Sequence, residues 1–166
     1  MGEVLAVVKA YTTRVGEGPF PTELRDALGE RLRVVGHEFG TTTGRPRRCG
    51  WLDVVQLRYA CAVNGVDAFA VTKLDVLDGL DEIRICTGYR ADGKGLPAFP
   101  ASAGLLARVR PVYETHPGWQ ASTGGVRRMK ALPPEARRYL RRVSQLCGVP
   151  IRMVSVVAER GAVIHA

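Results

Sequence analysis

The residues best suited to recognition chemistry are Thr72, Lys73, Leu74 and Asp75, which end an apolar run that predicts a strand. A carboxylate at Asp75 can accept hydrogen bonds from the ring N–H and the exocyclic amine of guanine, two adjacent donors that adenine lacks. The stem of Lys73 can lie along the base plane. Open α/β sheets bind ligands beyond the carboxyl ends of their strands, which makes guanine recognition a hypothesis for this motif. Two solvated charges leaving a strand remain the alternative interpretation of this short motif.

A second candidate site is the glycine-bounded segment from Thr41 to Arg48, in which threonines precede Arg45, Arg47 and Arg48. Its hydroxyl and backbone N–H groups can wrap a carboxylate, and its arginines can clamp a second anion. An ordinary loop followed by a solvated basic tail is an equally valid interpretation.

Other motifs carry less functional information. Gly93-Lys94-Gly95 lacks the G-x-x-x-x-G-K-S/T pattern of a phosphate loop and predicts a hairpin turn instead. The three histidines are far apart in sequence and suggest no activated nucleophile. A basic run could bind an RNA backbone, but its helical spacing favours a solvated helix face, so nucleic acid is a disfavoured partner. The run consists of Arg127, Arg128, Lys130, Arg137, Arg138, Arg141 and Arg142.

Composition restricts the class of protein. The chain has 166 residues, of which 46% are hydrophobic and 24% charged, so a disordered tail is excluded. The net charge of +8 comes largely from arginine and favours an anionic partner, whether nucleotide, acidic metabolite or nucleic acid. No run reaches the roughly 18 apolar residues of a membrane span and no secretory signal precedes the first strand, which predicts a cytoplasmic protein. The four scattered cysteines predict reduced, structural thiols rather than a disulfide framework or a metal site.

The elements that must position these segments alternate between strand and helix. In the first half we expect a strand buried on both faces over Val4–Tyr11, weak helical character over Glu23–Leu32, a well-buried helix over Trp51–Val63 and a strand over Ala68–Thr72. In the second half we expect an antiparallel hairpin over Ile83–Tyr89 and Arg108–Glu114, a helix from Pro133 to Cys147 and a strand over Ile151–Val157. This order predicts a mixed α/β architecture.

Taken together, several segments resemble adenylosuccinate synthetase in sequence, order and spacing. They are Lys9-Ala10-Tyr11-Thr12-Thr13-Arg14-Val15-Gly16, Gly18-Pro19-Phe20-Pro21-Thr22-Glu23, Thr42-Thr43-Gly44-Arg45, Gly50-Trp51-Leu52-Asp53 and Thr72-Lys73-Leu74-Asp75-Val76-Leu77-Asp78. The similarity continues through Tyr113-Glu114-Thr115, Pro117-Gly118-Trp119 and Gly148-Val149-Pro150, and it runs from about Val4 to Val154.

The resemblance implies a fold and a reaction. The expected fold is the carboxy-terminal part of a P-loop NTPase-like α/β domain, with a mostly parallel sheet, an antiparallel hairpin excursion and flanking helices. In that family GTP phosphorylates the purine oxygen of IMP with the help of Mg²⁺. L-aspartate then displaces the phosphate to give adenylosuccinate, a step of the AMP branch of purine biosynthesis. The family's members are homodimers.

The resemblance also assigns binding roles to residues of this chain. The aspartate-binding loop would consist of Thr41, Thr42, Thr43, Gly44, Arg45, Pro46 and Arg47. Val15, through its backbone, and Arg45 would contact IMP. The GTP-binding residues would be Arg47, Lys73, Leu74, Asp75 and Ser155. In place of the family's Ser-x-Gly-Pro element this chain has Val157 and Ala158, and the added valine side chain is expected to weaken guanine binding.

The family's phosphate loop, magnesium ligands, catalytic base and catalytic acid belong to an amino-terminal half that these 166 residues do not contain. We therefore expect residues 1–166 to form a single incomplete domain with no catalytic and no metal-binding residue, inactive on its own. The alternative is a non-catalytic module that binds guanine nucleotide or a synthetase subunit, which an exposed apolar sheet edge would mark.

Overall fold

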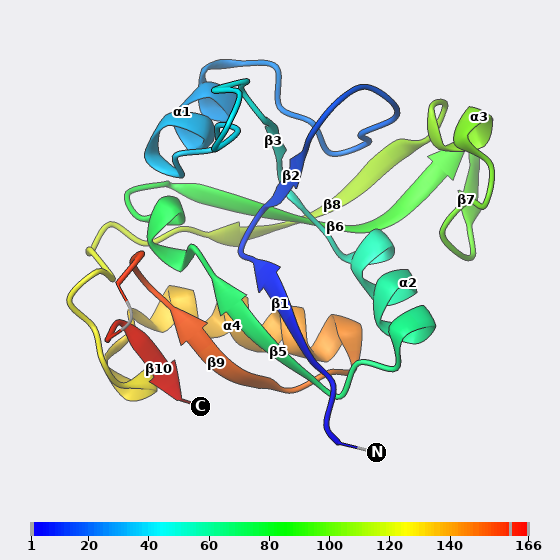
Figure 1. The fold of residues 1–166 in the computed structure, drawn as a ribbon. Helices are drawn as coiled ribbons and strands as arrows, with labels where there is room; N and C mark the ends of the chain where they lie inside the picture. The colour runs from blue at the N-terminus through cyan, green and yellow to red at the C-terminus, as the bar shows by residue number, and fades with distance from the viewer. Residues whose placement is uncertain (1, 160, 166) are drawn as a thin grey trace. The chain divides into compact units, whose positions relative to one another are not determined.

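Four strands form a sheet with the order β1-β5-β9-β10 in the computed structural model, which describes residues 2–159 and 161–165 (Figure 1). The strands are β1 (Leu5–Lys9), β5 (Ala68–Thr72), β9 (Ile151–Ser155) and β10 (Val163–His165). The first three are parallel, and β10 pairs antiparallel with β9. The sheet belongs to the first of two units, which contains the described residues of Met1–Ala10, Leu57–Ile83 and Thr115–Ala166.

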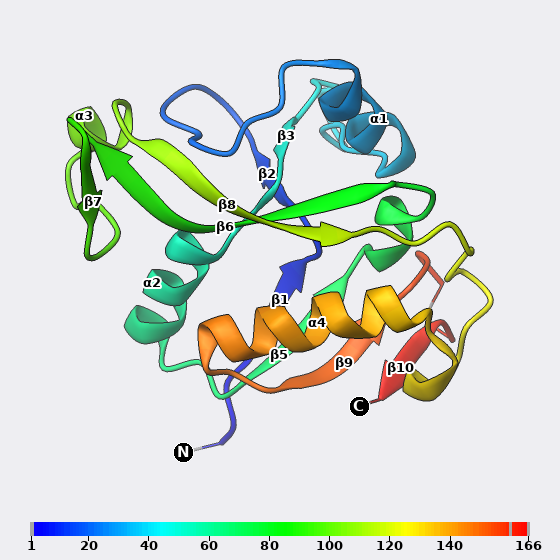
Figure 2. The same ribbon diagram turned by 180° about the vertical axis from the view of Figure 1, so that it is seen from behind.

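Helix α4 (Pro134–Cys147) covers one face of this sheet, as the two opposite views show (Figure 1, Figure 2). A proline in its first turn favours initiation, and Gly148 ends it with φ of 68°. Its apolar stripe is buried, and the buried Tyr139 donates a hydrogen bond from its hydroxyl to the Ala10 carbonyl at 2.6 Å. The predicted helix over this segment is confirmed, as is the strand that follows it.

The prediction of a strand buried on both faces over Val4–Tyr11 is wrong. β1 covers only Leu5–Lys9, and Val7 is 73% exposed. β1 is the outermost strand in the order of its sheet, so its apolar composition does not imply burial. The chain then enters a separate short strand, β2 (Thr12–Arg14).

The second unit, Tyr11–Gln56 and Arg84–Glu114, contains β2 and most of the antiparallel excursion. Strand β2 pairs antiparallel with β3 (Arg48–Gly50). The long strand β6 (Glu82–Ala91) pairs with β4 (Leu52–Asp53), β7 (Lys94–Leu96) and β8 (Arg110–Pro117). Asp92 and Gly93 form the two-residue turn between β6 and β7, both with positive φ, as expected for an Asp-Gly hairpin. The expected hairpin and the mixed α/β class are confirmed.

Two helices begin later than the sequence suggested. Asp26 caps α1 (Ala27–Val35) by accepting hydrogen bonds from two backbone N–H groups. Asp53 accepts from the backbone N–H of Gln56, so α2 (Val54–Asn64) begins after Asp53, while Leu52 and Asp53 form β4. The expected deep burial of this helix is also wrong, because Tyr59 is 52% and Val63 is 66% exposed.

The remaining helical elements are short. They are η1 (Leu74–Leu77), α3 (Ala103–Leu106) and η2 (Met129–Ala131). Among residues 2–159 and 161–165, no helix combines the length and apolarity needed to cross a bilayer.

The four cysteines are free thiols, three of them buried. Burial raises the pKa of Cys86 and that of Cys147 to about 12, which keeps both thiols neutral near pH 7. Neutral, desolvated thiols of this kind act as small packing residues.

Candidate functional site

The segment Lys73–Asp75 forms a tight turn at the carboxyl end of β5. Lys73 has a left-handed backbone with φ of 61°, an uncommon conformation for a residue other than glycine. Its carbonyl accepts from the Val76 N–H at 3.3 Å, and the Asp75 carbonyl accepts from the Asp78 N–H at 3.1 Å. Leu74 and Leu77 are fully buried and anchor the turn. Lys73 and Asp75 are left half-buried at its surface.

The carboxyl group of Asp75 is electrostatically tuned by this position. Burial raises its pKa above the ordinary value, and the nearby charge of Asp78 raises it further, whereas Lys73 lowers it. The charged form of Asp75 therefore lacks full compensation within the chain. A ligand that donates hydrogen bonds would supply the missing compensation.

Ser155 lies at the same edge of the sheet as this turn. Val71 of β5 is level with Val154 of β9, so the two parallel strands end side by side. The Ser155 hydroxyl donates to the Val157 carbonyl at 3.0 Å and closes a small turn. The half-buried Val157 has its Cγ1 3.3 Å from the point that a Cβ on Gly124 would occupy. Three of the predicted contacts, Lys73, Asp75 and Ser155, are thus brought together within the first unit.

In the second unit, the segment Thr41–Pro46 is an exposed loop. Its backbone closes on itself, because the Gly40 N–H donates to the Arg45 carbonyl and the Gly44 N–H donates to the Gly40 carbonyl, both at 2.8 Å. Gly44 has φ of 63°, which a glycine adopts without strain. The side chains of Thr41, Thr42 and Arg45 are therefore accessible to a ligand.

The base of this loop is fixed by an ion pair between Glu38 and Arg47. Glu38 is fully buried, and its Oε2 accepts from Arg47 Nη1 at 2.8 Å while its Oε1 accepts from the Tyr11 hydroxyl at 2.7 Å. The Arg47 N–H donates to the Glu38 carbonyl at 2.9 Å, and the Arg47 carbonyl accepts from Arg33 Nε at 2.9 Å. Arg47 is thus held at its guanidinium group and at both sides of its backbone.

Val15 follows the last residue of β2, and Arg47 precedes the first residue of β3. Arg14 pairs with Arg48 in the register, so Val15 and Arg47 both lie immediately beyond the same end of this strand pair. Val15 is 75% exposed, as a residue that presents its backbone to a ligand would be. The structure therefore brings the predicted IMP contact at Val15 beside the predicted aspartate loop.

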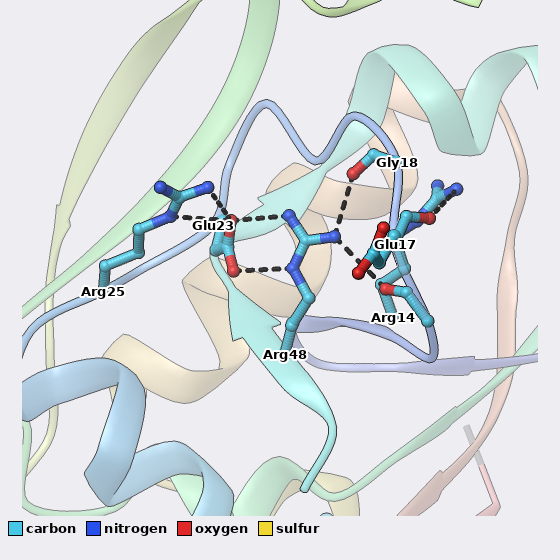
Figure 3. A network of polar contacts seen from close by, with 7 residues as sticks. Arg14, Glu17, Gly18, Glu23, Arg25 and Arg48 are labelled. Carbon is cyan, nitrogen blue, oxygen red and sulfur yellow. Dashed lines mark hydrogen bonds and ion pairs between the residues drawn. The ribbon is translucent and has the colours of Figure 1, made fainter.

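Arg48 holds the segment that follows Val15 (Figure 3). Its guanidinium group forms a bidentate pair with Glu23 at 2.7 and 2.6 Å, and it donates to the carbonyls of Gly18 at 2.8 Å and Gly16 at 3.3 Å. It also lies 5.5 Å from the centre of the Phe20 ring. This pairing lowers the pKa of Glu23. Of the three arginines considered for a second anion, Arg48 is therefore committed to the protein itself.

Sequence reasoning did not single out Glu38, Arg48 or Asp78 as organisers of these segments. Glu38 and Tyr11 are 27 positions apart, and Asp78 and Thr123 are 45 positions apart. No local pattern signals such pairs.

Comparisons with known proteins agree on one family. The family model of adenylosuccinate synthetase matches residues 1–164. Adenylosuccinate synthetase 1 of Chromobacterium violaceum is 60% identical over 159 residues, covering 96% of this chain and 37% of that protein. The adenylosuccinate synthetase of Heliobacterium modesticaldum is 55% identical over 165 residues, covering 99% of this chain and 39% of that protein. The chain thus spans less than two fifths of the length of these curated relatives.

A solved structure shows the same similarity in three dimensions. The fully ligated adenylosuccinate synthetase from Plasmodium falciparum matches this chain with a TM-score of 0.97 at 39% sequence identity. The match covers 100% of this chain and 40% of that one.

Proposed function

Because this chain belongs to the adenylosuccinate synthetase family, we propose that it supplies the guanine-recognition turn and the aspartate-binding loop of a GTP-dependent ligase. The ligase would join IMP and L-aspartate to form adenylosuccinate. The observation that carries this proposal is the turn at the end of β5, where Lys73 and Asp75 stand beside Ser155 at the carboxyl edge of a parallel sheet. Ligands bind at this edge in open α/β sheets.

In the proposed complex, the Asp75 carboxylate accepts hydrogen bonds from both donors of guanine, and the Lys73 stem lies along the base. The fully buried side chain of Leu74 anchors the turn in the core. The left-handed backbone of Lys73 supports a functional role, since strain of this kind concentrates at binding sites. Ser155, at the end of the neighbouring strand β9, completes the proposed guanine site.

The loop Thr41–Pro46 is proposed to bind the L-aspartate substrate. Its exposed hydroxyl groups and backbone N–H groups can hold a carboxylate, and Arg45 can pair with a second anionic group, including that of IMP. Arg47, fixed by Glu38, is proposed to reach the guanine nucleotide. Val15 is proposed to contact the IMP ribose through its backbone.

Phosphoryl transfer depends on positioning the γ-phosphate and neutralising its charge. The sequence contains no phosphate-loop pattern. Among the residues that the structure describes, no group of three histidine, cysteine or acidic side chains is placed to hold a metal ion. We propose that the family's amino-terminal half must be supplied before the ligation proceeds.

A second candidate function is that of a non-catalytic module that binds guanine nucleotide or a synthetase subunit. The position of β1 favours it, because Leu5 and Val7 are 42% and 73% exposed on a strand that ends the order of its sheet. Exposed apolar edge strands of this kind recruit partner chains.

The test combines binding with activity. The purified chain is titrated with GTP and with ATP by calorimetry, alone and together with a separately expressed amino-terminal half that carries the phosphate loop. Phosphate release that requires both IMP and aspartate is assayed in the mixture. Phosphate release that occurs in the mixture but not with the chain by itself supports the ligase proposal. Guanine binding without release supports the module, and neither release nor a preference for guanine overturns both.

A further inference from the structure

Asp78, the residue that follows the turn η1, has hydrogen-bond donors on both of its carboxylate oxygens. Its Oδ1 accepts from the indole Nε1 of Trp119 at 2.6 Å and from the Thr123 hydroxyl at 3.0 Å. Its Oδ2 accepts from the Thr123 backbone N–H at 2.7 Å. Thr123 is fully buried and Asp78 is half-buried, so these contacts are partly shielded from water. Charge-assisted hydrogen bonds of this length are about twice as strong as neutral ones.

The backbone beside Asp78 is tied to the same segment. The Gly79 N–H donates to the Trp119 carbonyl at 2.8 Å, and the Gly118 N–H donates to the Asp81 carbonyl at 2.8 Å. The approach is so close that a Cβ on Gly118 would lie 1.8 Å from the Leu80 carbonyl oxygen. Residues 78–81 and 118–123 therefore run side by side as one joined pair of segments.

This pair of segments is in turn connected to the helix behind the sheet. The Trp119 ring packs against the Tyr139 ring of α4, with centroids 6.1 Å apart. Asp78 therefore couples the turn that carries Asp75 to α4, a rigid element of the first unit.

We propose that Asp78 is a positioning residue for guanine specificity: it fixes the turn Lys73–Leu77 so that the Asp75 carboxylate meets both donors of guanine at once. This inference rests on the proposed function of the turn. The backbone link is direct, because the Asp78 N–H donates to the Asp75 carbonyl. Guanine differs from hypoxanthine only by the exocyclic amine. Distinguishing the two bases requires the carboxylate to keep its second hydrogen bond, which a small displacement removes.

The test compares GTP with inosine triphosphate, which lacks that amine, as co-substrates in the mixture of this chain with the amino-terminal half. Asp78→Asn loses one acceptor oxygen and turns an NH₂ group toward existing donors. We expect the ratio of kcat/KM for GTP to that for inosine triphosphate to fall about tenfold. The matched control is Asp81→Asn, which makes the same chemical change in the same pair of segments but keeps an acceptor oxygen for its single donor, Gln120 Nε2, and should leave the ratio unchanged.

A loss of folding alone would lower the rates with both nucleotides and leave their ratio intact, so the ratio isolates positioning. Thr123→Ser, which keeps the hydroxyl and the N–H, should retain the preference, whereas Thr123→Val should weaken it. An unchanged ratio in Asp78→Asn, when Asp75→Asn abolishes the preference, overturns the inference but not the proposed function. A wild-type mixture with no preference overturns the proposed function.

Hydrogen exchange of the 166-residue chain tests the positioning step without any nucleotide. The amide protons of Val76 and Asp78 bond to carbonyls within the turn. We expect Asp78→Asn to speed their exchange at least tenfold, and Asp81→Asn to leave it unchanged. Unaltered exchange at both amides in Asp78→Asn overturns the inference, whatever the nucleotide assays give.

Discussion

The turn Lys73–Leu77 and the loop Thr41–Pro46 are proposed to bind parts of one reacting assembly, yet they are built by opposite means. The turn buries its own apolar side chains and is followed by Asp78, whose half-buried carboxylate accepts several hydrogen bonds. The loop buries none of its residues, and only its base is fixed, by the ion pair between Glu38 and Arg47.

This difference follows from what each segment would have to recognise. Selecting one purine over another requires a rigid carboxylate, because a single exocyclic amine carries the distinction. Holding a small dicarboxylate requires several donors that can close around it, which an exposed loop supplies when its ends are fixed. Substitutions in the turn should therefore affect stability and specificity together, whereas those in the loop should separate the two.

The sharpest test of the loop's base is Glu38→Ala. It leaves the buried Tyr11 hydroxyl without this acceptor and removes the carboxylate that holds Arg47, and we expect a loss of about 3 kcal/mol in the free energy of unfolding. Urea denaturation measures it. Glu30→Ala, which removes an exposed pair with Arg33, should cost under about 0.5 kcal/mol. Equal effects of the two variants would show that the loop is not fixed by its buried base.

The pair of segments behind the turn is tested by Gly118→Ala. The new Cβ would collide with backbone atoms of Leu80, which cannot move without breaking the contacts around Asp78, and we expect a loss of about 2 kcal/mol. Thermal unfolding provides the comparison with Gly125→Ala, where a Cβ meets open space. If Gly118→Ala is as stable as Gly125→Ala, the close approach of the two segments is not maintained in solution.

The segment that follows Val15 is tested through two arginines that share one carboxylate. Arg48→Lys loses the bidentate geometry with Glu23 and the contacts with Gly16 and Gly18, and we expect a loss of about 1.5 kcal/mol. Arg25, whose side chain is 81% exposed, binds the same Glu23, and Arg25→Ala should cost under about 0.5 kcal/mol. The two losses are measured by chemical denaturation. A larger loss in Arg25→Ala than in Arg48→Lys would contradict the role assigned to Arg48.

The sequence allowed prediction of the helices and turns that are determined by neighbouring residues. Pro134, Gly148 and the apolar stripe between them specify α4, and Asp92-Gly93 specifies a hairpin turn. The sequence did not reveal which apolar side chains are exposed. Val7 and Tyr59 are of the same residue types as buried side chains, and only the position of their strand or helix in the fold determines their exposure. The sequence also correctly placed the predicted binding residues Lys73–Asp75 at the end of a strand and Thr41–Pro46 in a loop. It did not reveal the structural roles of Glu38, Arg48 and Asp78, because their partners are distant in the chain.

The pH dependence of stability sharpens the account of the turn. Burial and the charge of Asp78 raise the pKa of Asp75, so its contribution to stability is complete below the unfolded pKa, near 4, and is lost as pH rises through the folded pKa. We expect Asp75→Asn to unfold at higher urea concentration than the wild type at pH 7, and the gap to close near pH 3. The same variant should lose guanine preference. A variant less stable than the wild type at pH 7 would contradict the raised pKa.

The smallest effect on stability is expected at the tip of the loop. Thr42 is exposed, so Thr42→Ala should change the free energy of unfolding by under about 0.5 kcal/mol. In the mixture with the amino-terminal half, the same variant should raise the KM for aspartate about tenfold, since one hydroxyl donor to a carboxylate is lost, and leave the KM for GTP unchanged. Steady-state kinetics measure both constants. A rise in the KM for GTP, or an unchanged KM for aspartate, would contradict the proposal that the loop binds aspartate while the turn binds guanine. A base fixed by Glu38 allows the tip to be optimised for its ligand at almost no cost to the fold.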